Sequence, residues 1–183
     1  ITGFLRAVKT VSAGHRDDSA QEDWGRMLSE VEALIAGLST AKRAAFFELC
    51  GGRSAHQIWK ENAFRILDQD DGAFIAVFAR IARINHSCAP NCYSTFNDEA
   101  KRQAVRALRA IARGEELHIC YTGSQAAGMA RDARRALLRR RWGFACACAA
   151  CGLEGGALAA SDARRTRIAA LGARIEADAT EEG

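Results

Sequence analysis

The sequence of 183 residues lacks any apolar run that approaches the ~20 residues needed to span a bilayer. Its N-terminus lacks a charged-then-apolar leader with a small-residue cleavage site, so we expect no secretory signal. The chain also shows no internal repeat and no low-complexity tract. These absences predict a protein without a membrane partner, in a reducing intracellular compartment that is either nuclear or cytoplasmic.

A strong charge of one sign is also missing, because 26 Lys and Arg stand against 22 Asp and Glu. The formal net charge of +4 permits an acidic partner without demanding one. Few aromatic residues interleave with the arginines near the C-terminal third, so a stacking platform for bases is lacking. We therefore expect a solvated helix face and no nucleic-acid partner, although salt-dependent binding to DNA or RNA would support the opposite view. The arginines concerned are Arg131, Arg134, Arg135, Arg139, Arg140 and Arg141.

Cysteine, by contrast, is abundant, with seven residues in the chain. Because we expect a reducing compartment, metal binding is favoured over a disulfide framework. Three of the thiols lie within six residues, at Cys146, Cys148 and Cys151. Zinc takes four ligands in a tetrahedron, so this segment predicts a structural zinc site that needs one more ligand. The candidates for that ligand are Cys50, Cys88, Cys92, Cys120 and the histidines.

Two other uses of this cysteine cluster are less favoured. An iron–sulfur cluster usually takes more open cysteine spacings than these. A redox pair would use two cysteines and leave the third without a function. Zinc is therefore the expected ion, in a structural rather than a catalytic site.

The first third of the chain predicts two helices that serve core packing. Apolar residues recur at helical spacing after Ser19, at Trp24, Met27, Leu28, Val31, Leu34, Ile35 and Leu38. Ser39 and Thr40 can cap a second helix that turns Phe46, Phe47 and Leu49 inward. Residues 51–56 resemble a loop, and residues 58–67 fit either a helix end or an extended segment.

The remainder of the chain predicts three strands and two further helices. Apolar runs or alternating residues indicate strands at 73–84, 105–111 and 116–121. Residues 131–142 predict a basic helix, and residues 161–178 predict a last helix, with Gly155-Gly156 as the linker before it. The apolar positions expected on these helices are Ala133, Leu137 and Leu138 on the first, and Ile168, Leu171 and Ile175 on the second.

A polar turn contains the only proline of the chain, in the sequence Asn85-His86-Ser87-Cys88-Ala89-Pro90-Asn91. The turn comes directly after a predicted buried strand. Taken by itself, it would contain ordinary hydrogen-bonded turn residues. Its neighbours along the chain support a different interpretation.

The segment Arg83-Ile84-Asn85-His86-Ser87-Cys88-x-Pro90-Asn91 is the first of three ordered motifs. It is followed by Gly114-Glu115-Glu116-Leu117-x-Ile119-x-Tyr121 and then by Cys-x-Cys-x-x-Cys. This order closely resembles the C-terminal half of SET-domain protein-lysine methyltransferases. The stretch from Ile58 to Phe64 is similar to the helix-to-strand segment of the SET-and-MYND branch and its fungal-type relatives, and Trp142-Gly143-Phe144 is similar to their sequence before the cysteines. The resemblance covers residues 56–152.

The resemblance implies an α+β SET-type fold of small β-sheets with a pseudoknot, a helical insert before it and a C-terminal zinc-bound post-SET segment. Residues 1–55 would form the N-terminal segment and the helical insert, and residues 56–124 the SET core. Residues 125–153 would form a connecting helix and the post-SET zinc segment. Residues 154–183 would form a C-terminal helix.

The resemblance also implies S-adenosylmethionine-dependent methyl transfer to the side-chain amine of a lysine in a protein substrate, histone or non-histone. Tyr121 would be the catalytic residue, although without the flanking motifs it would be an ordinary half-buried strand tyrosine. The cofactor contacts would be Asn62, Asn85, His86 and Phe144. The zinc ligands would be Cys88, Cys146, Cys148 and Cys151.

Other polar residues of these motifs are expected to be structural. Glu115 and Glu116 follow Arg113-Gly114, so we expect turn and strand-start residues with structural hydrogen bonds. Cys92 and Cys120 are expected to be small buried residues rather than ligands. His118 has no assigned function.

Two features of the resembled branch are not found in the sequence. The Gly-x-Gly strand pair that opens the family's domain is missing, since Ile1-Thr2-Gly3-Phe4-Leu5 has one glycine, and so is the MYND zinc finger. We expect either a fragment that begins after those strands or a domain that has lost them. The alternative function is therefore a catalytically inactive, zinc-stabilised SET-like module for protein interaction.

Overall fold

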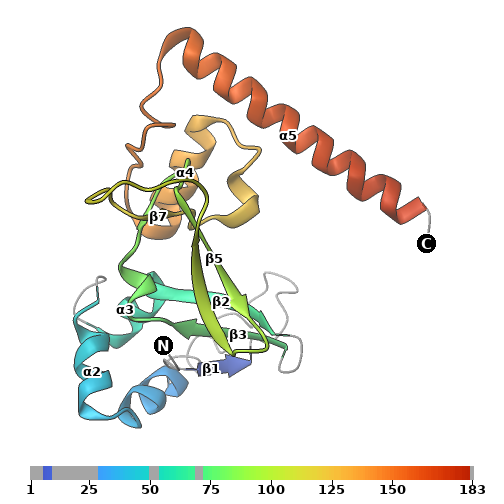
Figure 1. Ribbon diagram of the computed structural model, residues 1–183. Coiled ribbons are helices and arrows are strands. Elements are labelled where there is room, and N and C mark those ends of the chain that lie inside the picture. Colours follow the sequence, from blue (N-terminus) through green and yellow to red (C-terminus); the bar gives the residue numbers. More distant parts are fainter. Residues whose placement is uncertain (1–5, 10–28, 50–53, 69–71, 182–183) are drawn as a thin grey trace. The chain divides into compact units, whose positions relative to one another are not determined.

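The computed structural model describes residues 6–9, 29–49, 54–68 and 72–181 (Figure 1). It divides into two compact units, Ile1–Ile84 with Ser94–Arg106, and Asn85–Tyr93 with Ala107–Gly183. Helices and small sheets occur together in the described residues, so the predicted α+β class is confirmed. The expectations for Trp24, Met27 and Leu28, for the glycines at 51–52 and for Cys50 lie outside the described residues.

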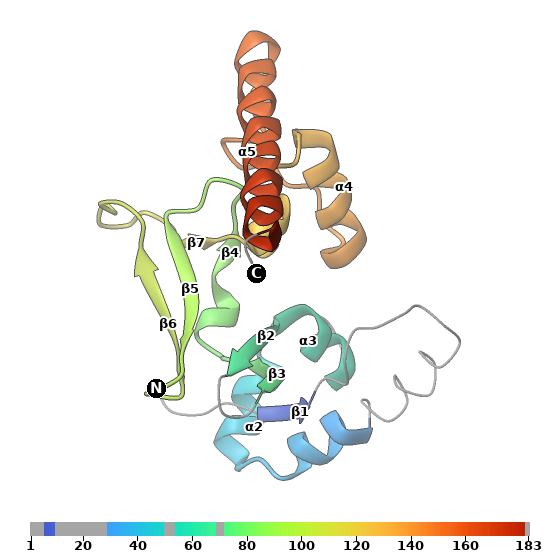
Figure 2. The same cartoon turned by 90° about the vertical axis from the view of Figure 1, so that its right-hand side faces the viewer.

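The first unit contains a small antiparallel sheet in the order β1-β3-β2 (Figure 2). Its strands are β1 Arg6–Lys9, β2 Ala63–Asp68 and β3 Gly72–Val77. Strand β1 lies where the sequence shows no alternation, so no strand is predicted there. Ile66 and Phe74 are paired across β2 and β3, and both side chains are buried.

The strand predicted at 73–84 is too long, because β3 ends at Val77. The apolar run continues, but the Ala82 N–H donates to the Phe78 carbonyl at 2.8 Å. This turn takes the chain out of the strand and leads into the 3-10 helix η1, Ile81–Arg83, in which the Ile84 N–H donates to the Ile81 carbonyl at 3.0 Å. Phe74, Ala76 and Val77 are buried, whereas none of residues 78–84 is. Apolar composition therefore predicted neither the burial nor the backbone conformation of the chain beyond Val77.

Helices cover the core of the first unit. Residues 29–36 are helical, followed by α2 Thr40–Phe47 and α3 Ala55–Asn62. The buried core residues are Val31, Ile35, Phe46, Leu49, Ile58, Trp59 and Val77. Phe47 is 45% exposed, which contradicts the expected inward position, since adjacent helical residues differ by about 100° in direction. Ser39 precedes α2 without a side-chain cap bond, whereas Ser54 caps α3 through the Gln57 N–H.

The ambiguous stretch 58–67 contains the helix-to-strand change that the resemblance implies. Helix α3 ends at Asn62, and β2 begins at Ala63. The Asn62 side chain is buried, and its Nδ2 donates to the Ile58 carbonyl at 2.7 Å. This bond gives the buried amide a backbone acceptor within its own helix.

Two strands, β5 Cys92–Asn97 and β6 Arg102–Ala107, form a two-stranded sheet. Strand β5 was not predicted, and the strand predicted at 105–111 lies too far along the chain, because β6 is Arg102–Ala107. The Asn97 Oδ1 accepts from the Ala100 N–H at 2.6 Å and closes the turn between the two strands. Beyond β6 the backbone leaves the sheet, and the Leu108 N–H donates to the Asn91 carbonyl at 2.8 Å.

The second unit contains a short parallel pair, β4 Asn85–His86 and β7 His118–Ile119. It also contains η2 Gly123–Ala126, α4 Arg131–Trp142 and the long helix α5 Gly155–Glu181 (Figure 1). The strand predicted at 116–121 shortens to two residues, because the Asn91 side chain takes the Glu116 carbonyl and the His118 N–H. In the described parts of the chain, no helix combines the length and apolarity that a membrane crossing requires.

Helix α4 has the predicted bounds, but the buried side differs from the prediction. Leu137 and Leu138 are buried, whereas Ala133 is exposed and Arg134 is 1% exposed. The expected solvated arginine face is therefore wrong at Arg134. The reason is helical spacing: Arg134 lies three residues before Leu137 and four before Leu138, so all three side chains share one face of the helix.

Helix α5 contains the predicted helix 161–178 but begins at Gly155, so Gly155-Gly156 is not a linker. Gly155 has φ 51°, a left-handed conformation that glycine adopts at little cost. Gly128 lies so near this helix that an added Cβ would be 2.4 Å from the Ala169 Cβ. The expected stripe of Ile168, Leu171 and Ile175 is exposed, by 54%, 45% and 69%.

Candidate functional site

The pairing of β4 with β7 brings together two of the sequence motifs. Asn85 lies beside His118 and His86 beside Ile119, and the Ser87 N–H continues the pairing to the Ile119 carbonyl at 3.0 Å. Tyr121 follows β7 two residues later, and Cys88 follows β4 two residues later. The short sheet thereby fixes the backbone from which both residues extend.

A buried amide and a carboxylate brace the approach to β7. The Asn91 side chain is 3% exposed, and its Nδ2 donates to Glu115 Oε1 and to the Glu116 carbonyl, both at 2.9 Å. Glu115 also binds the Arg109 guanidinium and accepts from the Ala112 N–H at 3.1 Å. Bonds from Arg109, then Asn91 and Ala112, lower the pKa of Glu115 to about 2. These are the structural hydrogen bonds expected for this glutamate.

Glu115→Gln is expected to lower the melting temperature at neutral pH, because the amide cannot replace a carboxylate beside Arg109. Since the pKa falls on folding from 4.5 to about 2, the carboxylate's contribution is complete above 4.5 and disappears as the pH falls through 2. The difference in melting temperature between wild type and variant should therefore shrink over that range. Thermal melts at a series of pH values measure it, with Glu99→Gln, an exposed glutamate, as control. A difference that stays constant from pH 7 to pH 2 would contradict this account.

His86 uses both ring nitrogens within the protein. Its Nδ1 accepts from the Tyr121 N–H at 3.1 Å, and its Nε2 lies 3.4 Å from the Cys88 sulfur. Burial, with smaller effects of His118 and Arg134, lowers the pKa of His86 to about 4. The ring is therefore neutral at physiological pH, and its proton lies on Nε2, which donates to the sulfur. One side chain thus connects the tyrosine backbone with the cysteines.

Four aromatic rings meet at Tyr121. Ring centroids lie 5.2 Å away for His86, 5.6 Å for Trp142 and 6.4 Å for Phe144. Gly143, with φ 77°, ends α4 in a left-handed conformation and directs the chain from Trp142 to Phe144. Trp142 belongs to the Trp142-Gly143-Phe144 motif but was not predicted as a site residue. Its position at a helix end, directly before Gly-Phe, is the sequence feature that could have identified it.

The four predicted zinc ligands come together in the second unit. The sulfurs of Cys88, Cys146, Cys148 and Cys151 all lie within 4.8 Å of one another. Cys88 lies 3.9 Å from Cys146 and 3.6 Å from Cys151. A tetrahedral zinc with sulfurs about 2.3 Å away separates them by about 3.8 Å, so the arrangement fits the metal. Cys92 and Cys120 lie outside this group, and the Cys120 sulfur contacts Thr122 Oγ1 at 3.2 Å.

The pKa of one thiol of the cluster is lowered, and the pKa values of two others are raised. Burial alone would raise the pKa of Cys148, but backbone N–H groups of Cys88 and Cys151 lower it to about 6. Burial raises the pKa of Cys146 to about 11 and raises that of Cys88 further. Metal binding requires thiolates, so a bound cation would supply the charge that ionises the buried thiols.

The remaining predicted contacts lie in different places. Asn85 is exposed on β4, and its Nδ2 donates to Glu116 Oε1 at 2.7 Å. His118 Nε2 lies 3.6 Å from the other carboxylate oxygen of Glu116. Asn62 belongs to the first unit, with the bond to Ile58 described above. The second unit by itself therefore unites His86, Tyr121 and Phe144 with the cysteine cluster.

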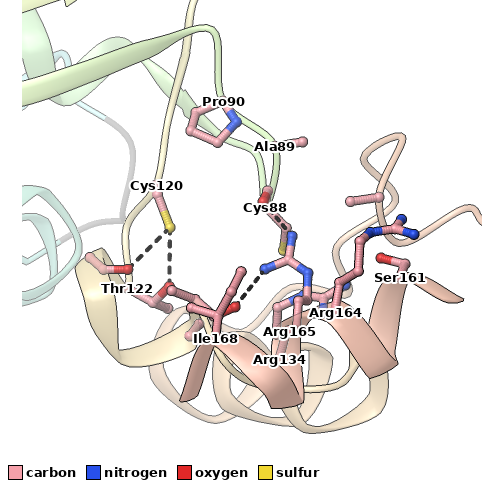
Figure 3. A pocket seen from close by; sticks show the side chains of 14 residues that line it. Cys88, Ala89, Pro90, Cys120, Thr122, Arg134, Ser161, Arg164, Arg165 and Ile168 are labelled. Atoms are coloured by element: carbon pink, nitrogen blue, oxygen red, sulfur yellow. Dashed lines mark hydrogen bonds between the residues drawn. The ribbon is translucent and has the colours of Figure 1, made fainter. Parts of the chain in front are cut away.

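A cavity of about 550 Å³ adjoins the cysteine cluster (Figure 3). It is lined by the Cys88–Pro90 turn, by the 3-10 helix η2 and by side chains of α4 and α5, and none of the four aromatic residues lines it. Arg165 of α5 reaches across, and its Nη2 donates to the Cys88 carbonyl at 2.9 Å. Arg134, which was expected on a solvated helix face, also borders this space.

Comparison with known proteins agrees with the motifs. The SET domain family matches residues 12–122, more than half of the chain. Histone-lysine N-methyltransferase SMYD3 of Mus musculus is 38% identical over 77 residues, 42% of this chain and 17% of the relative. Histone-lysine N-methyltransferase set5 of Schizosaccharomyces pombe is 31% identical over 109 residues, 59% of this chain and 32% of the relative.

A third relative aligns over more of the chain. Protein-lysine N-trimethyltransferase SMYD5 of Danio rerio is 28% identical over 165 residues, 81% of this chain and 40% of the relative. The chain thus spans less than half the length of each of these three proteins. The predicted resemblance to the SET-and-MYND branch and its fungal-type relatives is confirmed by these matches. The chain belongs to the SET-domain family.

Proposed function

We propose that this chain carries the catalytic tyrosine and part of the cofactor site of a protein-lysine methyltransferase. The observation that carries the proposal is the position of Tyr121, whose N–H is bound by His86 and whose ring lies among His86, Trp142 and Phe144. The relatives named as lysine methyltransferases support the same reaction. The substrate would be a lysine side chain of a protein.

The aromatic cluster suits a lysine that must lose its proton. A free lysine has a pKa near 10.4, and apolar surroundings favour the neutral amine that can attack a methyl group. Tyr121, Trp142 and Phe144 are partly buried and provide such surroundings. A fixed hydroxyl at Tyr121 would orient the amine, and orientation with electrostatics supplies most of the rate in this kind of displacement.

S-adenosylmethionine supplies the methyl group when it is bound. We assign its contacts to Asn62, Asn85, His86 and Phe144. Since both ring nitrogens of His86 have partners, its contact would come from the backbone or the ring face. A neutral imidazole beside aromatic rings does not repel a sulfonium cation, which supports this assignment.

We assign zinc to Cys88, Cys146, Cys148 and Cys151. Four protein ligands leave no open position, so the metal would be structural. It would hold the segment that carries Phe144 against the β4 turn. Residues 12–122 contain Cys88 but not the other three ligands, so this assignment rests on the geometry of the cluster.

Titration calorimetry of S-adenosylmethionine into the zinc-loaded chain tests the cofactor site. Asn85→Ala is expected to weaken binding at least about tenfold, the effect of losing one buried hydrogen bond to the ligand. Glu116→Ala is the matched control, because it breaks the same Asn85–Glu116 bond from the other side but keeps the amide. We expect the control to bind within about threefold of wild type.

The outcomes separate the enzyme from its alternative. Saturable binding that Asn85→Ala weakens and Glu116→Ala keeps supports the cofactor site. Equal losses in both variants would assign Asn85 a structural function only. No binding by a folded chain with one zinc would contradict the proposal and favour a zinc-stabilised interaction module without activity.

A further inference from the structure

Arg134 is the largest fully buried side chain of the described residues, with 1% exposure. It lies on α4, where the neighbouring Arg135 and the arginines at 139–141 are exposed. A buried guanidinium is stable only when anions or hydrogen-bond acceptors compensate its charge. The residues around Arg134 should therefore reveal the compensating anion.

The protein groups around Arg134 compensate it incompletely. Its Nη1 donates to the Met129 carbonyl at 2.6 Å and lies 3.7 Å from Asp162 Oδ1 of α5. Asp162 Oδ1 also accepts from the Arg131 N–H at 2.9 Å, so this carboxylate is shared. In the part of the chain that the structure describes, Arg134 Nε has no hydrogen-bond partner.

The remaining arm of Arg134 points to the cysteine cluster. Its Nη2 donates to the Cys151 sulfur at 3.8 Å. Four thiolates around one Zn²⁺ carry a net charge of −2, on ligands that are buried or partly buried. Arg134, with the Arg165 guanidinium at the Cys88 carbonyl, brings positive charge to this site from α4 and α5 (Figure 3).

We propose that Arg134 is a positioning residue for the metal, the buried countercharge that stabilises the thiolates of Cys88 and Cys151 and retains zinc. The proposal rests on the zinc site assigned above. Mutation of residues that contact metal ligands commonly lowers metal affinity about 10- to 100-fold, because these residues stabilise the ligands through hydrogen bonds and electrostatic interactions. The guanidinium of Arg134 thus compensates the negative charge of the thiolates, and the thiolates compensate the buried positive charge of Arg134.

A purely structural function is the competing explanation, because Arg134 also joins α4 to Met129 and to α5. Three variants of the full chain separate the two. Arg134→Met keeps much of the side-chain length and removes the charge, whereas Arg134→Lys keeps the charge and loses the branched guanidinium group. Asp162→Asn keeps an acceptor for the Arg131 N–H and removes the competing negative charge. Arg135→Met is the control for loss of an arginine from α4.

Zinc affinity is measured by competition with a chromogenic chelator, after wild type is shown to bind one zinc. We expect Arg134→Met to bind zinc about 10- to 100-fold more weakly. Arg134→Lys should stay within about fivefold of wild type, since it keeps a positive charge near the Cys151 sulfur. Asp162→Asn and Arg135→Met should bind no more weakly than wild type.

Cobalt(II) replaces zinc as a spectroscopic probe of the sulfurs. Loss of the N–H···S bond makes the thiolate a better electron donor, so the sulfur-to-cobalt band of Arg134→Met should move to longer wavelength, while that of Arg135→Met should not. Wild-type zinc affinity and an unshifted band in Arg134→Met would overturn the proposal. So would equal losses in Arg134→Lys, Arg134→Met and Asp162→Asn, which indicate a structural tie. If Arg134→Met does not fold, Arg134→Gln, which also removes the charge, takes its place in the affinity measurement, with the same expected loss and the same contradicting result. A wild-type chain that binds no zinc would instead contradict the metal assignment itself.

Discussion

Cys151→Ser is expected to release the metal and to destabilise the second unit of the chain. The Cys151 sulfur lies 3.6 Å from the Cys88 sulfur and accepts a hydrogen bond from Arg134. Its loss therefore breaks the cluster that connects β4, α4 and the 146–151 segment. Structural zinc in small sites contributes roughly 10–16 kcal/mol of apparent binding free energy. Losing one ligand should lower the free energy of unfolding by at least about 4 kcal/mol, a decrease of about 10 °C in melting temperature.

Zinc content per chain, thermal melting and amide hydrogen exchange of α4 and α5 measure this effect. Cys120→Ser is the matched control, because it makes the same sulfur-to-oxygen change in the same unit but outside the cluster. We expect the control to keep one zinc, and chelator-treated wild type to melt like Cys151→Ser. A serine variant that retains zinc with unchanged affinity would show that Cys151 is not a ligand.

Tyr121→Phe is expected to lower kcat for methyl transfer about 10²- to 10³-fold, the loss typical when one preorganised hydroxyl near the reacting atoms is removed. The change leaves the Tyr121 N–H on His86 and keeps a ring next to Trp142 and Phe144. Zinc content and S-adenosylmethionine affinity should therefore remain within about twofold of wild type.

The chain offers a matched control for this variant, because it contains only two tyrosines. Tyr93 is 43% exposed on β5, and Tyr93→Phe should leave the rate unchanged. Methyl transfer from radiolabelled S-adenosylmethionine to histones and lysine peptides gives the rates. A wild-type rate in Tyr121→Phe would exclude the hydroxyl from the reaction, and a loss confined to cofactor affinity would assign Tyr121 to binding alone.

Local sequence patterns predicted the features that depend on a few neighbouring residues. The bounds of α4 follow from its helical composition. The change from α3 to β2 came only from the resemblance, because residues 58–67 by themselves fit either a helix end or an extended segment. The thiol spacing of Cys146, Cys148 and Cys151 predicted a metal site with one missing ligand. These features could be predicted because helix propensity and ligand reach act over one or two turns.

Other features depended on which distant residues became neighbours. The strand after Glu116 is short because the Asn91 side chain takes backbone groups that a longer ladder would use. Strand β1 forms because β3 offers a free edge, not because its own sequence alternates. Phe47 is exposed, although an apolar side chain favours burial, because the adjacent Phe46 is the side chain that faces the core.

The sequence by itself determined the α+β class, the order of the three motifs and three thiols of the cluster. The tertiary structure decided that Cys88 completes the cluster, that His86 connects Tyr121 to Cys88 and that Arg134 is buried against Cys151. The physical reason is the β4–β7 pairing, which brings together residues more than thirty positions apart, and the contacts of α4 and α5 with Cys151 and Cys88. Spacing along a chain cannot predict such contacts, because a charge or a sulfur acquires its partners only when the chain is folded.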